Sequence, residues 1–240
     1  MAGHSKWSNI KRKKAREDAK RGQIFTKAAR QITVAVREGG SDPETNFRLR
    51  LAIDAARAVN MPNDNIERAI ARGEGGLDGA DFSEIFYEGY GPNGVAVLLY
   101  TLTDNRNRTA GELRHRFSKY GGNLGENGCV AWMFKRRGLL VVEREKVDED
   151  EVMLLALEAG AADVVVEGDV LEIHTEPADF SRIKEELEEQ GLEFLGAEIS
   201  FIAENNVAIS AEQESSVEKL IESLEDLDEV QEVYSNYEVV

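Results

Sequence analysis

Cysteine and histidine are nearly absent from this chain of 240 residues. Its single cysteine, Cys129, cannot form an internal disulfide or a zinc site built on a cysteine pair, and it is typical of a reducing compartment. The three histidines, His4, His115 and His174, are too scattered for a recognisable metal-ligand spacing. The longest apolar run, 95–100, is far shorter than the roughly 18 residues of a membrane helix. We therefore expect a cytoplasmic protein without membrane attachment, metal or other cofactor.

Recognisable catalytic motifs are also scarce. Cys129 has no neighbour in sequence that would activate its thiol, and the glutamates of 185–189 fall on the outer face of a predicted helix, where a solvated surface is expected. The segment 89–94 matches the G-x-G-x-x-G dinucleotide fingerprint, but it leads into a strand-like run where the fingerprint requires a helix. We predict a hairpin turn at this segment and no enzyme activity, with a carboxylate-based enzyme as an outside alternative.

Charge is distributed very unevenly along the chain, whose total is −17. Residues 1–80 carry 16 basic and 10 acidic side chains, and residues 81–137 carry 8 and 6. Residues 138–240 carry only 5 basic side chains and 30 acidic ones, a net charge of −25. Between Lys6 and Arg37, in contrast, 11 cations accompany two acids, a net charge of +9. A negative protein is repelled by nucleic acid unless one end is specialised, so the basic end predicts a nucleic-acid contact.

This basic end divides into two parts. Residues 1–21 have little apolar periodicity and predict an arm, in which Trp7 can stack on a base. Residues 22–38 follow the helical repeat, with cations opposite the apolar face. The residues predicted to contact nucleic acid here are Lys6, Trp7, Lys11, Arg12, Lys13, Lys14, Arg16, Lys20, Arg21, Lys27 and Arg30.

A second group of cations is predicted on a helix that starts after Asn105. Arg106, Arg108 and Arg114 are its predicted nucleic-acid contacts. Free backbone amides and guanidinium groups at a helix start could bind an anion, but the same residues also suit an N-cap with solvated arginines. The segment 122–125 resembles the G-x-x-G clamp of single-strand RNA binders, although it precedes a strand, which makes the signal weak.

Apolar periodicity predicts an α+β fold. A second helix is predicted with Asp42 as N-cap and Pro43 at its first position. Its predicted core stripe is Phe47, Leu51, Ala55, Ala58 and Val59. Later strands are predicted at 82–88, 95–103, 130–134, 139–143, 163–167, 170–175 and 193–202, helices at 148–159 and 177–190, and a last helix and strand at 211–225 and 229–237.

The order of these elements suggests three domains. Residues 1–78 form a basic arm and helical domain, 79–136 plus 204–240 a discontinuous domain, and 137–203 an acidic domain with the βαββαβ order of a ferredoxin-like sandwich. The predicted fold class is therefore α+β: an N-terminal helical domain followed by two ferredoxin-like α/β sandwich domains, the third inserted into the second. No heptad or large apolar stripe demands assembly, and a monomer is expected.

Several unusual strings span nearly the full chain, at 2–7, 60–70, 87–92, 103–109 and 121–125. Taken in this order, they resemble the YebC family, which includes the mitochondrial translational activator of cytochrome c oxidase subunit I. The resemblance implies a helical first domain, ferredoxin-like domains after it, and no enzyme activity.

The resemblance leaves two expected functions. Bacterial members are described as DNA-binding transcriptional regulators, so the first expectation is a nucleic-acid-binding regulator of gene expression. The mitochondrial relative and ribosome-associated bacterial members suggest the alternative, a translation factor that binds ribosomal RNA or mRNA, with the ribosome as a partner. No helix-turn-helix with a clear base-reading face is evident in the sequence, which on chemical grounds slightly favours folded RNA.

Overall fold

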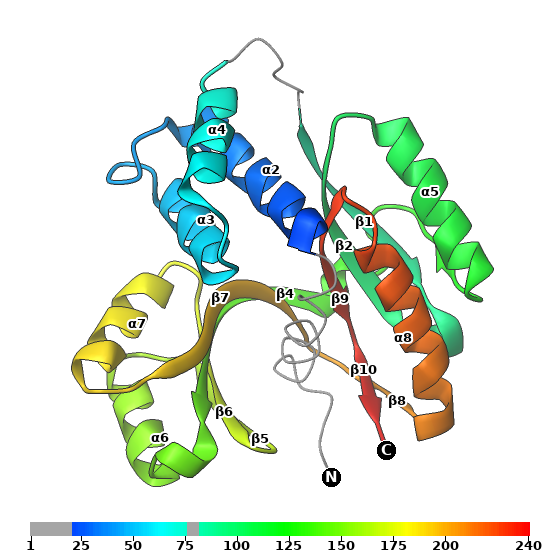
Figure 1. Cartoon of the computed structure of the whole chain (residues 1–240). Coiled ribbons are helices and arrows are strands. Elements are labelled where there is room, and N and C mark those ends of the chain that lie inside the picture. The colour runs from blue at the N-terminus through cyan, green and yellow to red at the C-terminus, as the bar shows by residue number, and fades with distance from the viewer. Residues whose placement is uncertain (1–20, 76–81) are drawn as a thin grey trace.

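Three amphipathic helices open the described chain and enclose one small core. The computed structural model describes residues 21–75 and 82–240. The helices are α2 (Arg21–Gly39), α3 (Phe47–Ala58) and α4 (Asn63–Gly73), grouped at the upper left of Figure 1. This confirms the helical N-terminal part. The buried side chains of its core include Ile32, Ala35, Val36, Leu49, Ile53, Ala56 and Ile66.

The start of α3 differs from the prediction. Asp42 and Pro43 lie ahead of the helix, and the N-cap is Asn46, whose Oδ1 accepts a hydrogen bond from the backbone N–H of Leu49 at 3.0 Å. The side-chain amide of Asn46 also donates to the carbonyls of Ala35 and Gly40, both at 2.7 Å. Asn46 therefore ties the start of α3 to the end of α2. This tertiary contact explains why α3 starts later than predicted, and the N-cap pattern in the local sequence does not reveal it.

The predicted core stripe of α3 was also wrong. Phe47 and Leu51 are 41% and 38% exposed, whereas Leu49 and Ile53 are buried. Of the predicted stripe, Val59 packs against the core and the two alanines are exposed. The outward Phe47 ring has the Arg50 guanidinium 5.7 Å from its centroid. Because this helix is apolar on two sides, its periodicity alone does not decide which side is buried.

Replacing Asn46 by alanine is expected to destabilise the helical unit by about 2–4 kcal/mol, since it removes an N-cap and leaves two carbonyls without their donor. Asp42→Ala is the matched control. Asp42 accepts only the N–H of Glu44 through its side chain, at an exposed position, so its loss should cost about 1 kcal/mol or less. Urea unfolding measures both variants. Equal stabilities would contradict the assignment of Asn46 as the cap.

A four-stranded sheet forms the second unit. Its strands are β1 (Ser83–Tyr90), β2 (Ala96–Thr103), β3 (Asn123–Leu124) and β9 (Val230–Ser235), in the order β3-β1-β2-β9. The first two pair antiparallel from Ser83↔Thr103 to Tyr90↔Ala96, so the G-x-G-x-x-G segment is the hairpin turn predicted for it. Strand β9, near the end of the chain, thus completes a sheet that begins at Ser83.

Both faces of this sheet are covered. Helices α5 (Arg106–Lys119) and α8 (Ala211–Glu225) lie on one face, on the right of Figure 1, and enclose the core that contains Leu99, Phe117 and Leu220. On the other face, Leu98 and Tyr234 pack against residues outside the sheet, among them Val130, Phe134 and Phe201.

The third unit is built on a long ribbon of two strands. Strands β4 (Phe134–Glu143) and β7 (Phe194–Ala203) pair antiparallel, and one end of the ribbon packs on the second unit while the other enters a second sheet. The unit also contains η4 (Arg144–Lys146), α6 (Glu149–Glu158), β5 (Asp163–Glu167), β6 (Val170–Thr175) and α7 (Phe180–Glu189). Its sheet has the order β5-β6-β4-β7, with α6 and α7 packed against its core.

Two predicted strands need correction. The strand expected at 130–134 is a 3₁₀ turn, η3 (Ala131–Met133), because the backbone N–H groups of Val130 and Ala131 donate to the Glu88 carboxylate instead of to a strand. The strand expected at 229–237 is interrupted at Asn236, whose buried side chain bonds Ala96 N and Asn205 O. Beyond it, β10 (Tyr237–Val239) pairs in parallel with β8 (Val207–Ile209).

Within residues 21–75 and 82–240, no helix is both long enough and apolar enough to span a membrane.

Candidate nucleic-acid interface

Most of the predicted arm contacts lie outside the described residues and stay predictions: Lys6, Trp7, Lys11, Arg12, Lys13, Lys14, Arg16 and Lys20. The structure places the residue that follows them. Arg21 is exposed and is the first residue of α2. The position of the start of α2 therefore decides where any contact made by the arm begins.

The start of α2 is fixed to the C-terminal end of α8. The Gln23 side-chain amide donates to the carbonyl of Asp226 at 2.6 Å, and the Lys27 ammonium donates to the carbonyl of Glu225 at 2.7 Å. The last carbonyls of a helix lack intrahelical donors and carry partial negative charge, so an amide and an ammonium are favourable partners there. Lys27 thus has an anchoring role within the chain.

Arg30 also bridges the first and second units. Its guanidinium lies 5.4 Å from the centroid of the Phe82 ring, and its Nη1 is 3.5 Å from the carbonyl of Leu102. Lys27 and Arg30 are both half-buried. Their roles as nucleic-acid contacts stay predictions, but the structure gives both cations a role in holding the helical unit in place.

Sequence reasoning missed a second tie between these units. The Arg48 guanidinium forms ion pairs with Glu38 and with Glu84 on β1, and its Nη2 also donates to the Tyr100 hydroxyl at 3.0 Å. No local motif marks this cluster, because its members come from α2, α3, β1 and β2. The helical unit is therefore held on the sheet by polar contacts at two separate places.

The three predicted contacts on α5 have different surroundings. Arg108 pairs with Asp104 at 2.7 Å and with Glu229 at 2.9 Å, and Asn105 accepts the Arg108 N–H at 3.1 Å as N-cap. Asn105 is therefore the N-cap of α5, and the predicted anion contact at this helix start stays a prediction. Arg106 and Arg114 are exposed and form no ion pair with any described residue. Eight residues of helix separate them, which places them about 12 Å apart along the axis and roughly 80° apart around it.

The glycines of 122–125 are explained by close packing. A Cβ on Gly122 would lie 2.5 Å from the carbonyl oxygen of Tyr90, and one on Gly125 would lie 2.5 Å from the Cys129 sulfur. Burial raises the pKa of the Cys129 thiol, and the charge of Glu88 raises it further. The thiol is therefore a poorer nucleophile than an ordinary cysteine.

The loop after these glycines is held by a buried carboxylate. Glu88 is only 5% exposed and accepts backbone N–H bonds from Gly128 at 2.6 Å, and from Val130 and Ala131 at 2.7 Å each. Burial acts to raise the pKa of Glu88, but the three donors outweigh it, and the net pKa is lowered. The glutamate thus stays charged and organises the loop that leads into β4.

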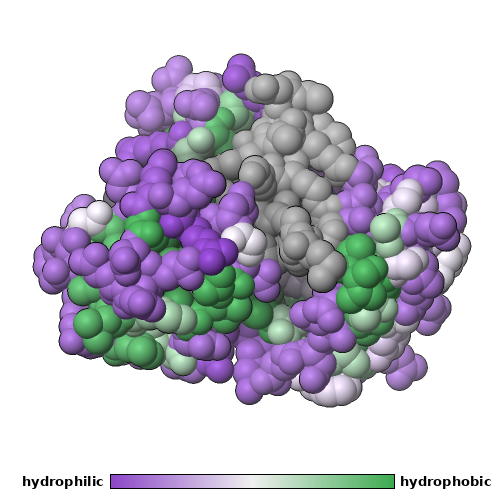
Figure 2. Space-filling model, turned by 90° about the horizontal axis from the view of Figure 1, so that it is seen from below, coloured by the Kyte–Doolittle hydropathy of each residue, from purple (hydrophilic) through white to green (hydrophobic). Residues whose placement is uncertain are grey.

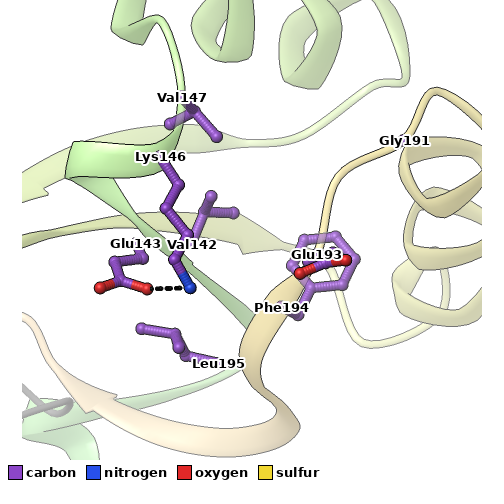
Figure 3. Close-up of a pocket in the computed structure, with 8 residues that line it drawn as sticks. All are labelled: Val142, Glu143, Lys146, Val147, Gly191, Glu193, Phe194 and Leu195. Carbon is purple, nitrogen blue, oxygen red and sulfur yellow. Dashed lines mark ion pairs between the residues drawn. The ribbon is translucent and has the colours of Figure 1, made fainter.

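A hollow of about 260 Å³ lies in the third unit, between the end of β4 and the start of β7 (Figure 3). Its cation, Lys146, is paired with Glu143 at 2.7 Å, and Glu193 is a further acid in its lining. The rest of the lining is largely apolar, so the hollow does not favour a phosphate. Elsewhere in the described chain no group of three or more histidine, cysteine or carboxylate side chains is arranged to hold a metal ion.

The lower surface of the third unit is unusually apolar for such an acidic segment. Seen from below (Figure 2), hydrophobic side chains gather among hydrophilic ones on the left, which is the side of α6 and α7 in Figure 1. Leu154, Leu157 and Val166 in this unit are 58%, 61% and 40% exposed. This surface differs in character from the cationic helices of the first two units.

The fold defines an α+β protein in which a helical unit with a basic N-terminal segment is fixed to two sheet-and-helix units. Residues 5–76 match the model of the TACO1/YebC protein N-terminal domain, and residues 82–237 match the model of the TACO1/YebC second and third domain. The chain belongs to the TACO1/YebC family, as its sequence strings predicted.

Relatives cover the whole chain. It is 59% identical over 242 residues to a "Probable transcriptional regulatory protein" of Halothermothrix orenii, covering 100% of this chain and 96% of the relative. A protein of the same name from Desulforamulus reducens is 53% identical, with 99% of each chain covered. The crystal structure of the conserved hypothetical protein Aq1575 from Aquifex aeolicus is 47% identical, with a TM-score of 0.84 over 94% of this chain and 93% of that one. These matches confirm the fold class and place the chain in a family in which these two relatives carry the name "Probable transcriptional regulatory protein".

Proposed function

We propose that this protein is a non-catalytic, nucleic-acid-binding regulator of gene expression, and in the first instance a cytoplasmic DNA-binding transcriptional regulator. The observation that carries the proposal is the charge distribution. A net charge of +9 before residue 38 precedes a chain that carries −25 after residue 137. Phosphate attracts the first segment and repels the last, so binding is directional.

The anchoring of α2 supports this proposal. Because Gln23 and Lys27 hold the start of α2 on the end of α8, the point at which the basic segment joins α2 has a defined position. Arg106 and Arg114 on α5 supply a second place for phosphate contacts. The relatives named as transcriptional regulators support the choice of DNA as the first target.

Translation is the second candidate, with ribosomal RNA or mRNA as the target. The observation that favours it is that several polar side chains of α5, the arginine-rich helix, already bond to other groups of the protein. Arg108 is paired with two carboxylates, Arg116 donates to Ser223 at 2.9 Å, and Asn105 serves as the cap. These side chains are engaged within the protein, whereas reading duplex DNA in the major groove requires a row of them directed at base edges. Folded RNA can be bound through shape, charge and stacking.

One comparison separates the two candidates. A lysate of cells that make the protein is sedimented on a density gradient with and without ribonuclease, and purified protein is titrated with genomic duplex fragments at physiological salt. Sequence-selective DNA binding without ribosome association supports transcription. Ribonuclease-sensitive migration with ribosomes and only non-selective DNA binding support translation. A protein that neither migrates with ribosomes nor binds DNA would contradict both candidates.

A further inference from the structure

Trp132 is the most conspicuous side chain on the surface of the second unit. It lies in η3 and is 65% exposed, and Tyr90 at the end of β1 is 36% exposed. Tryptophan and tyrosine bury large apolar areas in folded proteins, and their enrichment on surfaces is typical of interfaces. The core does not need these two side chains, because Val130 and Phe134 already cover the sheet face beside them.

The two aromatic residues converge on one acceptor. The Trp132 indole N–H donates to the carbonyl of Cys129 at 3.2 Å, and the Tyr90 hydroxyl donates to the same carbonyl at 3.1 Å. Their polar atoms are thus bonded to the loop. The part of each side chain that a partner would meet is ring carbon. We call Tyr90 and Trp132 the aromatic platform.

The loop under the platform is preorganised. Glu88 fixes the backbone N–H groups of Gly128, Val130 and Ala131, which lie on either side of the shared acceptor and directly before Trp132. A ligand that meets this platform would therefore pay little entropy to order it. Rigid aromatic side chains on a fixed loop are well suited to stacking.

Cations follow the platform along the chain. Lys135 pairs with Glu204 and Arg137 with Glu176, whereas Arg136 is exposed and has no ion pair with the described residues. Glu126 is the acidic residue of the same loop. After the helical unit, the sequence segment 81–137 carries 8 basic and 6 acidic side chains, a net positive charge. The residues after it are strongly acidic.

We propose that the aromatic platform stacks unpaired bases of a single-stranded nucleic acid, with Arg136 near its backbone. This inference rests on the proposed function, because it assigns part of the nucleic-acid contact to a second place on the protein. Proteins that bind single strands combine aromatic stacking with cations, and each stacked base contributes substantially to affinity. In a duplex the base faces are covered by their neighbours, so the platform selects unpaired segments.

Intrinsic fluorescence can test the platform directly. The chain contains two tryptophans, so in the full-length Trp7→Phe protein all indole emission comes from Trp132. We expect a short oligothymidylate to quench this emission, whereas a strand of the same length with abasic sites binds without quenching. A duplex of the same length should bind with little quenching.

Affinity provides the second measurement. In the natural background Trp132→Ala should weaken binding of the oligothymidylate by about 5- to 150-fold and leave duplex binding within about two-fold, whereas Trp132→Phe should retain most of the affinity. Because Trp132 is 65% exposed, the alanine variant should fold normally, and its thermal unfolding midpoint checks this. Leu154→Ala, which changes an exposed residue of the third unit, is the control.

The outcomes separate this inference from the proposed function. Oligothymidylate binding that is unchanged by Trp132→Ala would overturn the platform while the proposed function stands. Equal quenching by duplex and single strand would overturn the selectivity for unpaired bases. A natural protein that binds neither strand nor duplex would overturn both the platform and the proposed DNA-binding regulator.

Discussion

Neutralising four cations of the arm is expected to remove most of the salt dependence of nucleic-acid binding. The variant replaces Lys11, Arg12, Lys13 and Lys14 by glutamine. If about six cations of the basic segment meet duplex phosphates, the natural protein should show a slope of log affinity against log salt near −5. Losing four of them should bring the slope to about −2. Between about 50 and 200 mM salt, the natural protein should lose roughly 10³-fold in affinity and the variant about ten-fold.

The control for this variant must change net charge equally without touching the arm. Four cations of the third unit serve this purpose, because each has an acidic partner on the surface and such pairs contribute little to stability. They are Arg144, Lys146, Arg182 and Lys184, each replaced by glutamine. Fluorescence anisotropy with a labelled duplex measures both slopes. If the arm variant keeps the natural slope, or if the control loses as much, the arm is not the phosphate contact.

Amphipathic helices were the most predictable part of this fold. The predicted helix at 211–225 has the observed bounds of α8, and its Ser210 cap is reinforced by Gln213 in a capping box. Strands β5 and β6 also have their predicted bounds. In these segments one apolar face, local turn signals and the tertiary core agree, so a single sequence is sufficient.

The errors arose where distant residues decide the local structure. Asn46 is the cap of α3 because it bonds carbonyls of Ala35 and Gly40. Val130 and Ala131 leave the strand pattern because Glu88, more than 40 residues earlier, accepts their N–H groups. Neither partner can be inferred from neighbours in sequence.

The candidate interface shows the same limit. Charge alone selected Lys27, Arg30 and Arg108, and the structure places all three against carbonyls or carboxylates of other segments. Charge also selected Arg106 and Arg114, which are exposed. A sequence shows how many cations a segment has, but the fold determines which of them are already engaged within the protein.

The Glu88 carboxylate is expected to contribute strongly to stability, and Glu88→Gln should cost about 2–4 kcal/mol. One oxygen accepts the N–H of Gly128, and the other accepts those of Val130 and Ala131. Glutamine offers a single carbonyl oxygen and turns an NH₂ group toward the remaining donors. At least one of the three N–H groups therefore loses its acceptor, whichever way the amide is oriented.

The pH dependence of this cost has a defined sign. The folded-state pKa of Glu88 is lowered from its ordinary value, whereas in the unfolded chain it is about 4.3. The carboxylate therefore contributes its full stability above the unfolded-state pKa and loses it as pH falls through the folded-state pKa. The stability difference between the natural protein and Glu88→Gln should be largest near neutral pH and should shrink in acid.

Glu126→Gln makes the same chemical change on the loop that Glu88 organises, but at an exposed position. It should alter stability by no more than about 0.5 kcal/mol. Urea unfolding of the three proteins from neutral to acidic pH gives both the cost and its pH dependence. A Glu88→Gln protein as stable as Glu126→Gln at neutral pH would show that the three backbone bonds do not hold the loop. A cost that stayed constant into acid would show that the charge of Glu88, as distinct from its shape, is not what the loop requires.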